Sequence, residues 1–319
     1  MKDLPTWSIP LLVFGIAAIL YGWIKVQQER SDNPFADRQL VKKGMDLPCL
    51  WLYYDTSEVN SRWWADFGAR SSRALNLPFM NLCYDTIAKY NGQDYRIEVV
   101  GGLADLAARL GGWEALPLPL QNAQAQVRSP EMNWIRAALL AKYGGLWLNP
   151  AVICMKPFGM LPEDRVVFFG MDHDQSFAGR AGTKVPSLKA IWVPQPGNPI
   201  FVEWERRAFE RLQSRNGGRQ IRGDDKSDYA ELAAGKVEVV PNAELSRKGE
   251  SRKPLQLEDL LAAGEQDNLH FKVPCDTIYV PLPWPEIKER RMYGWFLRMS
   301  EDQILASDLA VSTLLRSAL

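Results

Sequence analysis

Residues 141–152 of this 319-residue chain read AKYGGLWLNPAV, a stretch that we call the elbow. It follows a run that starts Ser129-Pro130-Glu131, and a hydroxyl, a proline and an acid in this order are typical of a helix N-terminus. Gly144 is suited to end that helix, because glycine readily adopts the backbone conformation of a helix C-terminus. The apolar residues 146–148 then predict a short buried strand. The elbow therefore predicts a helix, a glycine turn and a strand, as in an α/β fold.

The rest of the chain shows the same alternation of helical and extended patterns. Strands are expected at 50–54, 95–100, 166–169, 190–193, 236–240 and 277–280, and helices at 78–90, 103–110, 199–212 and 303–317. With 46% hydrophobic and 24% charged residues, the composition is that of an ordinary globular protein. Because strands and helices alternate through the first half, we expect a mostly parallel, doubly wound sheet flanked by helices.

The N-terminal segment has the length and composition of a membrane-spanning helix. No charged residue occurs between Asp3 and Lys25, and aromatic residues lie near both ends of this apolar run. A helix needs about 20 apolar residues to cross a bilayer. We therefore predict a transmembrane anchor over 1–26, a juxtamembrane linker over 27–45 and one α/β domain over 46–319. The alternative is a cleaved signal peptide, which usually has a shorter apolar region.

The distribution of charge sets the expected orientation of the anchor and excludes one class of partner. Lys and Arg are more frequent after the apolar run than before it, which predicts that the domain stays on the cytoplasmic side of the membrane. A Golgi-type arrangement, with the domain in the lumen, is the alternative. Over the whole chain 38 basic residues balance 38 acidic ones, so there is no electrostatic case for binding nucleic acid.

The cysteines and histidines of the sequence exclude several kinds of site. Cys49, Cys83 and Cys154 stand in apolar runs, and the four cysteines form no CxxC pair, so buried free thiols are expected instead of a zinc site. Free thiols also agree with a reducing compartment. The two histidines leave little for a histidine-based metal cluster or a Ser-His-Asp triad. The sequence contains no Walker A loop and no Gly-x-Ser-x-Gly motif.

The last part of the elbow is the candidate ligand site. Ligands of open α/β sheets bind outside the carboxyl ends of the strands, and the segment after Leu148 should lie at such an edge. It reads Asn149-Pro150-Ala151, in which Asn149 brings an oxygen without a negative charge. Two interpretations stay open: Asn149 contributes to a ligand site, or it simply ends the strand, as asparagine often does in turns.

The helix and the elbow together resemble a known signature. Residues 133–157 are similar to the motif region of glycosyltransferases with a DxD motif, in particular the capsular polysaccharide synthesis and mannosyltransferase-like families. The family pattern is an Asp, two residues, an Arg, a helix ending in Tyr-Gly-Gly, a short strand and then Asp-x-Asp or Asp-Ala-Thr. Four positions match this pattern (Arg136, Tyr143, Gly144 and Gly145), and three depart from it (Asn133, Asn149 and Ala151).

The resemblance implies a GT-A fold, which is a Rossmann-like nucleotide-binding sheet, and a nucleotide-sugar donor. It assigns nucleotide-sugar binding to Asn133, Arg136, Tyr143, Gly144, Gly145, Asn149 and Ala151. It also implies a divalent cation, Mn²⁺ or Mg²⁺, held by the motif carboxylates. Because Asn149 and Ala151 replace those carboxylates, Asn149 is the candidate metal ligand that remains at the elbow.

A literal Asp-x-Asp occurs further along the chain. Asp172 and Asp174 follow the strand predicted at 166–169, and His173 stands between them. Carboxylate oxygens are the ligands that divalent cations such as Mg²⁺ prefer. Asp172 and Asp174 are therefore candidate metal ligands and candidate catalytic residues. The alternative is an ordinary polar loop, because Asp-x-Asp alone is a weak pattern.

Two functions from different classes fit these observations. The first is a membrane-anchored glycosyltransferase that moves a sugar from a nucleotide donor to a glycan or lipid-linked acceptor, as in polysaccharide biosynthesis. Arg136, with Lys142 or Lys156, would then replace part of the missing metal charge at the leaving diphosphate. The second is a catalytically inactive GT-A-like binding or scaffold protein at a membrane, since a fold alone does not establish a function.

Overall fold

The computed structural model describes most of the chain after residue 46. The described ranges are 47–54, 77–123, 125–172, 185–216, 231–248, 253–264 and 269–319. The chain divides into two units, Met1–Lys42 and Lys43–Leu319, and all of these residues belong to the second unit. The predicted anchor and linker therefore lie outside the described residues. Within the described ranges, no helix is long and apolar enough to cross a bilayer.

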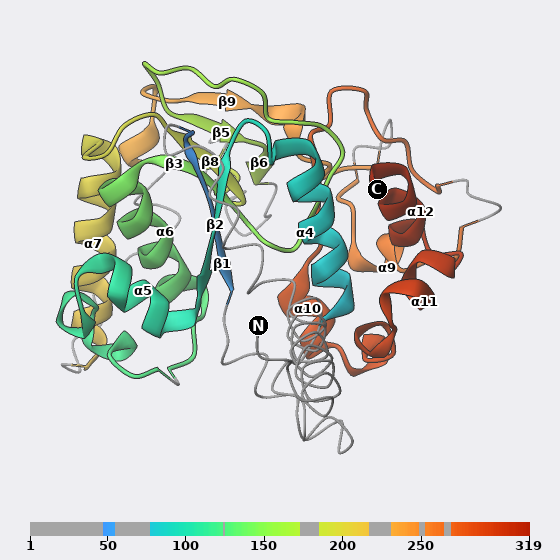
Figure 1. The fold of residues 1–319 in the computed structure, drawn as a ribbon, viewed down its shortest axis with the longest axis horizontal. Coiled ribbons are helices and arrows are strands. Elements are labelled where there is room, and N and C mark those ends of the chain that lie inside the picture. Colours follow the sequence, from blue (N-terminus) through green and yellow to red (C-terminus); the bar gives the residue numbers. More distant parts are fainter. Residues whose placement is uncertain are drawn as a thin grey trace, which may run out of the picture. The chain divides into compact units, whose positions relative to one another are not determined.

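A six-stranded sheet forms the centre of the second unit (Figure 1). In spatial order its strands are β2 (Arg96–Gly101), β1 (Cys49–Tyr54), β3 (Gly145–Leu148), β8 (Ala190–Val193), β5 (Val167–Phe169) and β9 (Glu238–Val240). The pairs β1–β2, β1–β3 and β5–β9 are parallel, whereas β8 runs antiparallel to its neighbours β3 and β5. The expected α/β fold, with a mostly parallel sheet flanked by helices, is confirmed.

Helices cover both faces of this sheet (Figure 1). On one face lie α5 (Gly102–Leu110), α6 (Ser129–Tyr143) and α7 (Pro199–Asn216), and on the other lies α4 (Pro78–Asn91). Trp51, Trp147 and Ile191 share the first face because they are register partners on β1, β3 and β8. They belong to one buried cluster with apolar side chains of α6 and α7. Burial of such large apolar groups is the main force that fixes these helices on the sheet.

The chain turns away from the central sheet directly after the elbow. β4 (Val152–Cys154) pairs with β10 (Tyr279–Pro281) in a small antiparallel sheet. Thr86 of α4 accepts a hydrogen bond from the backbone N–H of Cys154 through its Oγ1 (3.0 Å), which ties β4 to α4. The sequence predicts β10 but not β4, because a run of three apolar residues does not distinguish a strand from a turn. Other short elements of the unit are β6 (Met171–Asp172), β7 (Val185–Pro186), α9 (Leu257–Leu260) and α10 (Trp284–Glu289).

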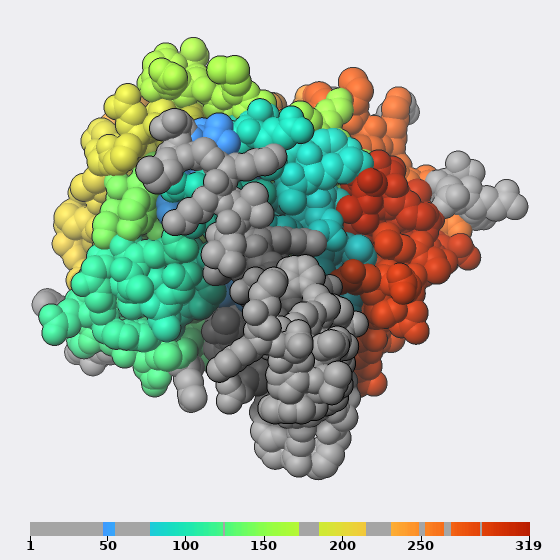
Figure 2. All heavy atoms as spheres, viewed as in Figure 1, coloured from blue at the N-terminus to red at the C-terminus, as the bar shows by residue number. Residues whose placement is uncertain are grey.

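The C-terminal segment packs on α4 (Figure 2). It forms two helices, α11 (Glu301–Ala306) and α12 (Ala310–Ala318), so the prediction of one helix over 303–317 is wrong. Backbone pairing across the chain explains the break: Asp308 accepts a hydrogen bond from the N–H of Gly264 through its carbonyl oxygen. Leu309 forms an antiparallel bridge with Ala263. Backbone groups that pair outside the helix cannot also form its internal hydrogen bonds.

The cysteines occupy different environments. All four are free thiols: Cys83 and Cys154 are buried, Cys49 is half-buried and Cys275 is exposed. The prediction of buried thiols is confirmed for Cys83 and Cys154. Burial raises the pKa of the Cys154 thiol to about 12, although Asn91 donates a hydrogen bond that lowers it. A neutral, inaccessible thiol of this kind serves the packing of the core.

Candidate functional site

The elbow runs along β3, from the side of the sheet where the parallel strands begin to the side where they end. We call the edge where the parallel strands begin the amino edge, and the edge where they end the carboxyl edge. Tyr143, Gly144 and Gly145 lie at the amino edge, because α6 ends there and β3 starts there. Asn149 leaves β3 at the carboxyl edge. The two halves of the elbow therefore have different surroundings.

The glycines at the amino edge are required by the backbone. Gly144 has φ 64° and ψ −158°, a combination that is accessible essentially to glycine alone. Gly145 has φ 93°, and a Cβ atom at this position would lie 2.5 Å from the carbonyl oxygen of Cys49 on β1. The two glycines thus allow α6 to turn sharply into β3 and β3 to approach β1.

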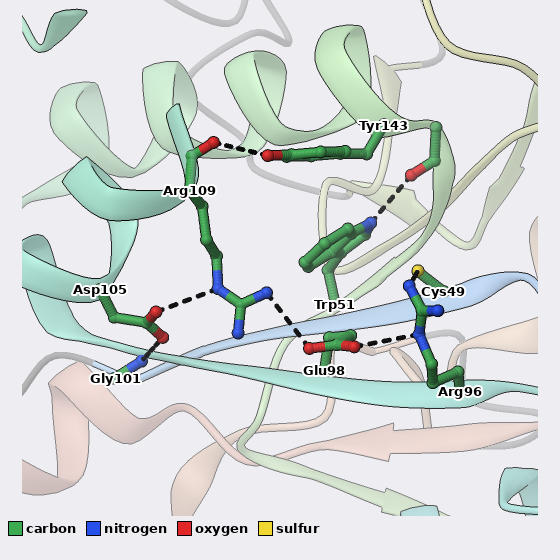
Figure 3. Close-up of polar contacts among 9 residues, drawn as sticks. Cys49, Trp51, Arg96, Glu98, Gly101, Asp105, Arg109 and Tyr143 are labelled. Carbon is green, nitrogen blue, oxygen red and sulfur yellow. Dashed lines mark hydrogen bonds and ion pairs between the residues drawn. The ribbon is translucent and has the colours of Figure 1, made fainter. Parts of the chain in front are cut away.

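Tyr143 is part of a network at the amino edge (Figure 3). Its hydroxyl donates a hydrogen bond to the carbonyl oxygen of Arg109 (2.5 Å), and its ring lies 5.2 Å from the ring of Trp51. Trp51 donates a hydrogen bond from Nε1 to the carbonyl oxygen of Gly144 (2.8 Å). Lys142 also donates to the carbonyl oxygen of Arg109 (2.8 Å). These bonds join the C-terminal ends of α5 and α6 to β1.

Ion pairs extend this network along β2 (Figure 3). The Arg109 guanidinium pairs with Asp105 (3.1 Å) and Glu98 (3.2 Å), and Glu98 also pairs with Arg96 (3.0 Å). Arg96 in turn donates a hydrogen bond to the sulfur of Cys49 (2.9 Å). The polar groups of the network bind one another, so its evident role is to hold secondary structure elements together. Tyr143, Gly144, Gly145 and Lys142 belong to this scaffold, away from the carboxyl edge.

Asn133 and Arg136 lie on α6 between the two edges, and both are buried. Arg136 donates a hydrogen bond from Nη1 to Oδ1 of Asn133 (2.8 Å), as their spacing of three residues on one helix face allows. The Arg136 guanidinium also lies over the Trp147 ring, 5.2 Å from its centroid. Only 8% of Arg136 is exposed, so its charge is directed at the protein interior.

Asn149 lies where ligands bind in α/β folds. β2 and β3 flank β1 on opposite sides, so the strand order reverses at β1, and the crevice at such a reversal is the usual ligand position. Here, however, Oδ1 of Asn149 accepts a hydrogen bond from the N–H of Ala151 (3.3 Å) and closes a turn. Ala151 itself is buried, with 1% exposure. A neutral amide oxygen engaged in a turn and a buried methyl group do not fit a divalent cation.

The second candidate metal site lies largely outside the described residues. The backbone of Asp172 ends β6, where it pairs with Val185 of β7. The Asp172 side chain, His173 and Asp174 are not among the described parts of the chain. Among the residues that are described, no three His, Cys, Asp or Glu side chains are grouped so as to hold a metal ion. A cation at Asp172 and Asp174 remains a prediction.

An ion pair that the sequence did not indicate lies beside the elbow at the carboxyl edge. Lys189 precedes β8, which starts at this edge because it is antiparallel to β3. The backbone N–H of Asn149 donates to the carbonyl oxygen of Lys189 (2.8 Å). The Lys189 ammonium lies 2.6 Å from Oε1 of Glu244, a residue that follows β9 at the same edge. The Lys189 side chain is 37% exposed and that of Glu244 only 2%.

The carboxylate of Glu244 is held on its other side as well. Oε2 lies 3.1 Å from the hydroxyl of Tyr279, which also donates to the carbonyl oxygen of Phe169 (2.6 Å). Burial and the neighbouring Glu244 carboxylate raise the pKa of Tyr279 well above its usual value, so the hydroxyl keeps its proton. Gly170 makes room for the carboxylate: it has φ 109°, and a Cβ atom there would lie 2.5 Å from Oε2 of Glu244.

Comparison of the sequence with protein-family models gives no match, and comparison with curated proteins gives none. The site is therefore defined by its geometry and by the resemblance of residues 133–157. Lys189 and Glu244 carry no local sequence signal, because they are 55 residues apart and only the fold brings them together.

Proposed function

We propose that this chain is a glycosyltransferase that moves a sugar from a nucleotide-sugar donor to a glycan or lipid-linked acceptor. The observation that carries the proposal is the position of the Asn149 turn, at the carboxyl edge beside the reversal of strand order. The resemblance of residues 133–157 to DxD-type glycosyltransferases supports the same site and a GT-A-like fold. The anchor predicted over 1–26 would keep the enzyme at a membrane, with the domain on the cytoplasmic side.

The proposed transfer exchanges one bond at the anomeric carbon for another and moves one proton. The bond between the anomeric carbon and the phosphate oxygen breaks, and its electron pair leaves on the nucleoside diphosphate. The acceptor hydroxyl oxygen bonds to the anomeric carbon and loses its proton to a carboxylate, for which Asp172 and Asp174 are the candidates. Arg136, held by Asn133, would support the nucleotide site indirectly, because it packs on Trp147 of β3. The leaving diphosphate also needs positive charge close to it.

A second function is favoured by one specific observation. The residues at the carboxyl end of the elbow offer no carboxylate, and Asn149 uses its side-chain oxygen in its own turn. The same lack of carboxylates is expected in a GT-A-like protein that binds a nucleotide or a partner at a membrane without catalysis.

Donor hydrolysis by the full-length protein in detergent separates these functions, because it needs no knowledge of the acceptor. We expect release of UDP or GDP from a panel of nucleotide sugars, measured with Mn²⁺ and with EDTA. Asp172→Asn and Asp174→Asn should each be tested, and loss of a catalytic base is expected to slow release by about 100-fold. Binding of a nucleotide sugar without any release would favour the scaffold function. If the protein neither binds nor hydrolyses any of these nucleotide sugars, both the proposed donor and the proposed site are contradicted.

A further inference from the structure

We propose that the Lys189 ammonium, held by Glu244, takes the place of a divalent cation beside the elbow and binds the diphosphate of the nucleotide donor. This inference rests on the proposed function for the identity of the ligand. Its starting point is the disagreement between the resemblance, which implies a cation at the elbow, and the residues there, which do not fit one.

Lys189 has the position that the inference requires. The backbone hydrogen bond from Asn149 to Lys189 (2.8 Å) fixes the start of β8 directly against the turn that stands where the family keeps its first motif acid. Two residues earlier, the N–H of Ser187 donates to the carbonyl oxygen of Gly170 (3.1 Å). The ends of β3 and β5 thus both meet the segment that carries Lys189. A charge on this segment lies at the carboxyl edge, where α/β sheets bind their ligands.

The two members of the ion pair are unequally exposed. Glu244 is buried, and its two oxygens are occupied by Lys189 and Tyr279, whereas more than a third of the Lys189 side chain reaches solvent. A buried ion pair is a poor source of stability, because desolvation of the charges offsets their attraction. Here the buried carboxylate fixes the ammonium end of a side chain that is partly exposed. Lysine has three N–H donors, and among the described residues its Nζ uses one of them, toward Glu244.

The other cations that the sequence suggested are engaged elsewhere. Arg136 is buried against Trp147, and Lys142 is bound at the amino edge. Lys156 donates to the carbonyl oxygen of Cys275, after β4 has carried the chain away from the central sheet. Lys189 lies at the carboxyl edge itself. Lysine is a common phosphate ligand that acts as a compact point charge, which suits a diphosphate without a metal.

Calorimetry with UDP, GDP and inorganic pyrophosphate in EDTA tests the inference on the full-length protein. The wild type is expected to bind at least one nucleoside diphosphate in EDTA, with a Kd within about threefold of that in Mn²⁺. Lys189→Met should weaken binding by about tenfold or more, and Lys189→Arg, which keeps the charge, by about threefold or less. Lys142→Met is the matched control, because it removes the same charge at the amino edge, and its Kd should not change.

A second variant separates a lost binding site from a damaged fold. Lys189→Met leaves a buried carboxylate without its cation, so we also propose the pair Lys189→Met with Glu244→Gln, which removes both charges and keeps the shape. If this double variant still unfolds cooperatively, at a melting temperature within a few degrees of the wild type, and fails to bind in EDTA, the inference is supported. If it binds as well as the wild type, Lys189 has only a structural role. Binding that requires Mn²⁺ would overturn the inference and leave the proposed function standing, whereas no binding in any condition would overturn both.

Discussion

The two edges of the central sheet are built differently, although the twelve residues of the elbow reach both. At the amino edge, the tilted rings of Tyr143 and Trp51 pack together and their polar atoms bind backbone carbonyls, while Arg109 bridges two carboxylates. At the carboxyl edge, Glu244 is buried and Lys189 reaches solvent. Polar groups that bind one another hold the amino edge together, whereas the partly exposed Lys189 is the group that we propose for ligand binding. Tyr143, Gly144 and Gly145, which match the DxD-type signature, therefore belong to the scaffold. Two of the three departures from the signature, Asn149 and Ala151, lie at the carboxyl edge.

The largest effect is expected from Gly145→Ala at the amino edge. A methyl group there would meet the carbonyl oxygen of Cys49 at 2.5 Å, and φ is 93°. We expect the free energy of unfolding in urea to fall by about 3 kcal/mol. Gly159→Ala is the control, because Gly159 also has a positive φ (69°) but a methyl group there would meet nothing within 4 Å, so the loss should be about 1 kcal/mol. Equal losses in the two variants would mean that close approach of β3 to β1 does not hold the amino edge.

The next effect concerns the stability of the carboxyl edge. Lys189→Met leaves Glu244 buried without its partner, and we expect a loss of about 2 kcal/mol in the free energy of unfolding. This is less than for a fully buried pair, because Lys189 is partly exposed and solvent screens it. Adding Glu244→Gln should recover about 1 kcal/mol, which a double-mutant cycle in urea would measure. Strictly additive losses would show that the two side chains are not coupled.

Tyr143→Phe is expected to have a smaller effect on stability. It also tests whether the amino edge takes part in ligand binding. The change keeps the ring that packs on Trp51 and removes the hydrogen bond to the carbonyl oxygen of Arg109. We expect a loss of about 1 kcal/mol in the free energy of unfolding. The affinity for UDP or GDP should be the same as in the wild type. A weaker affinity at unchanged stability would assign Tyr143 to the ligand site.

The smallest effect is expected in thiol labelling of the folded protein with iodoacetamide at pH 8. Cys275 is exposed and should react, whereas Cys154 should not, because its pKa of about 12 keeps it neutral and burial shields it. Cys49, half-buried at the amino edge, should react more slowly than Cys275. The raised pKa of Cys154 also favours the folded state below the unfolded pKa, near 9.0, and this contribution is lost as the pH rises toward 12. Rapid labelling of Cys154 at pH 8 would contradict this packing.

Local patterns predict the elements of this fold better than its connections. The helix before the elbow and the strand within it follow from a proline start, two glycines and an apolar run, and both are observed. The break between α11 and α12 could not be predicted, because it depends on backbone pairing of Asp308 with distant Gly264. The i, i+3 spacing of Asn133 and Arg136 predicts that they share a helix face, but not that both are buried or that Arg136 lies over Trp147.

The candidate site was only partly predictable for the same reason. The strand pattern indicates that Asn149 leaves the sheet at its carboxyl edge, and the structure has it there. The pairing of Lys189 with Glu244 depends on the antiparallel direction of β8 and on the end of β9, which are properties of the whole sheet. A single sequence carries no periodic signal for such a contact.

Amide hydrogen exchange tests most directly whether the ligand binds at the carboxyl edge. The full-length protein would be compared with and without a saturating nucleoside diphosphate, UDP or GDP, in EDTA. We expect slower exchange at residues 149–151 and 187–190, and no change at residues 109–113 and 143–146. Protection confined to the amino-edge segments, with the carboxyl edge unchanged, would contradict a ligand site at the carboxyl edge.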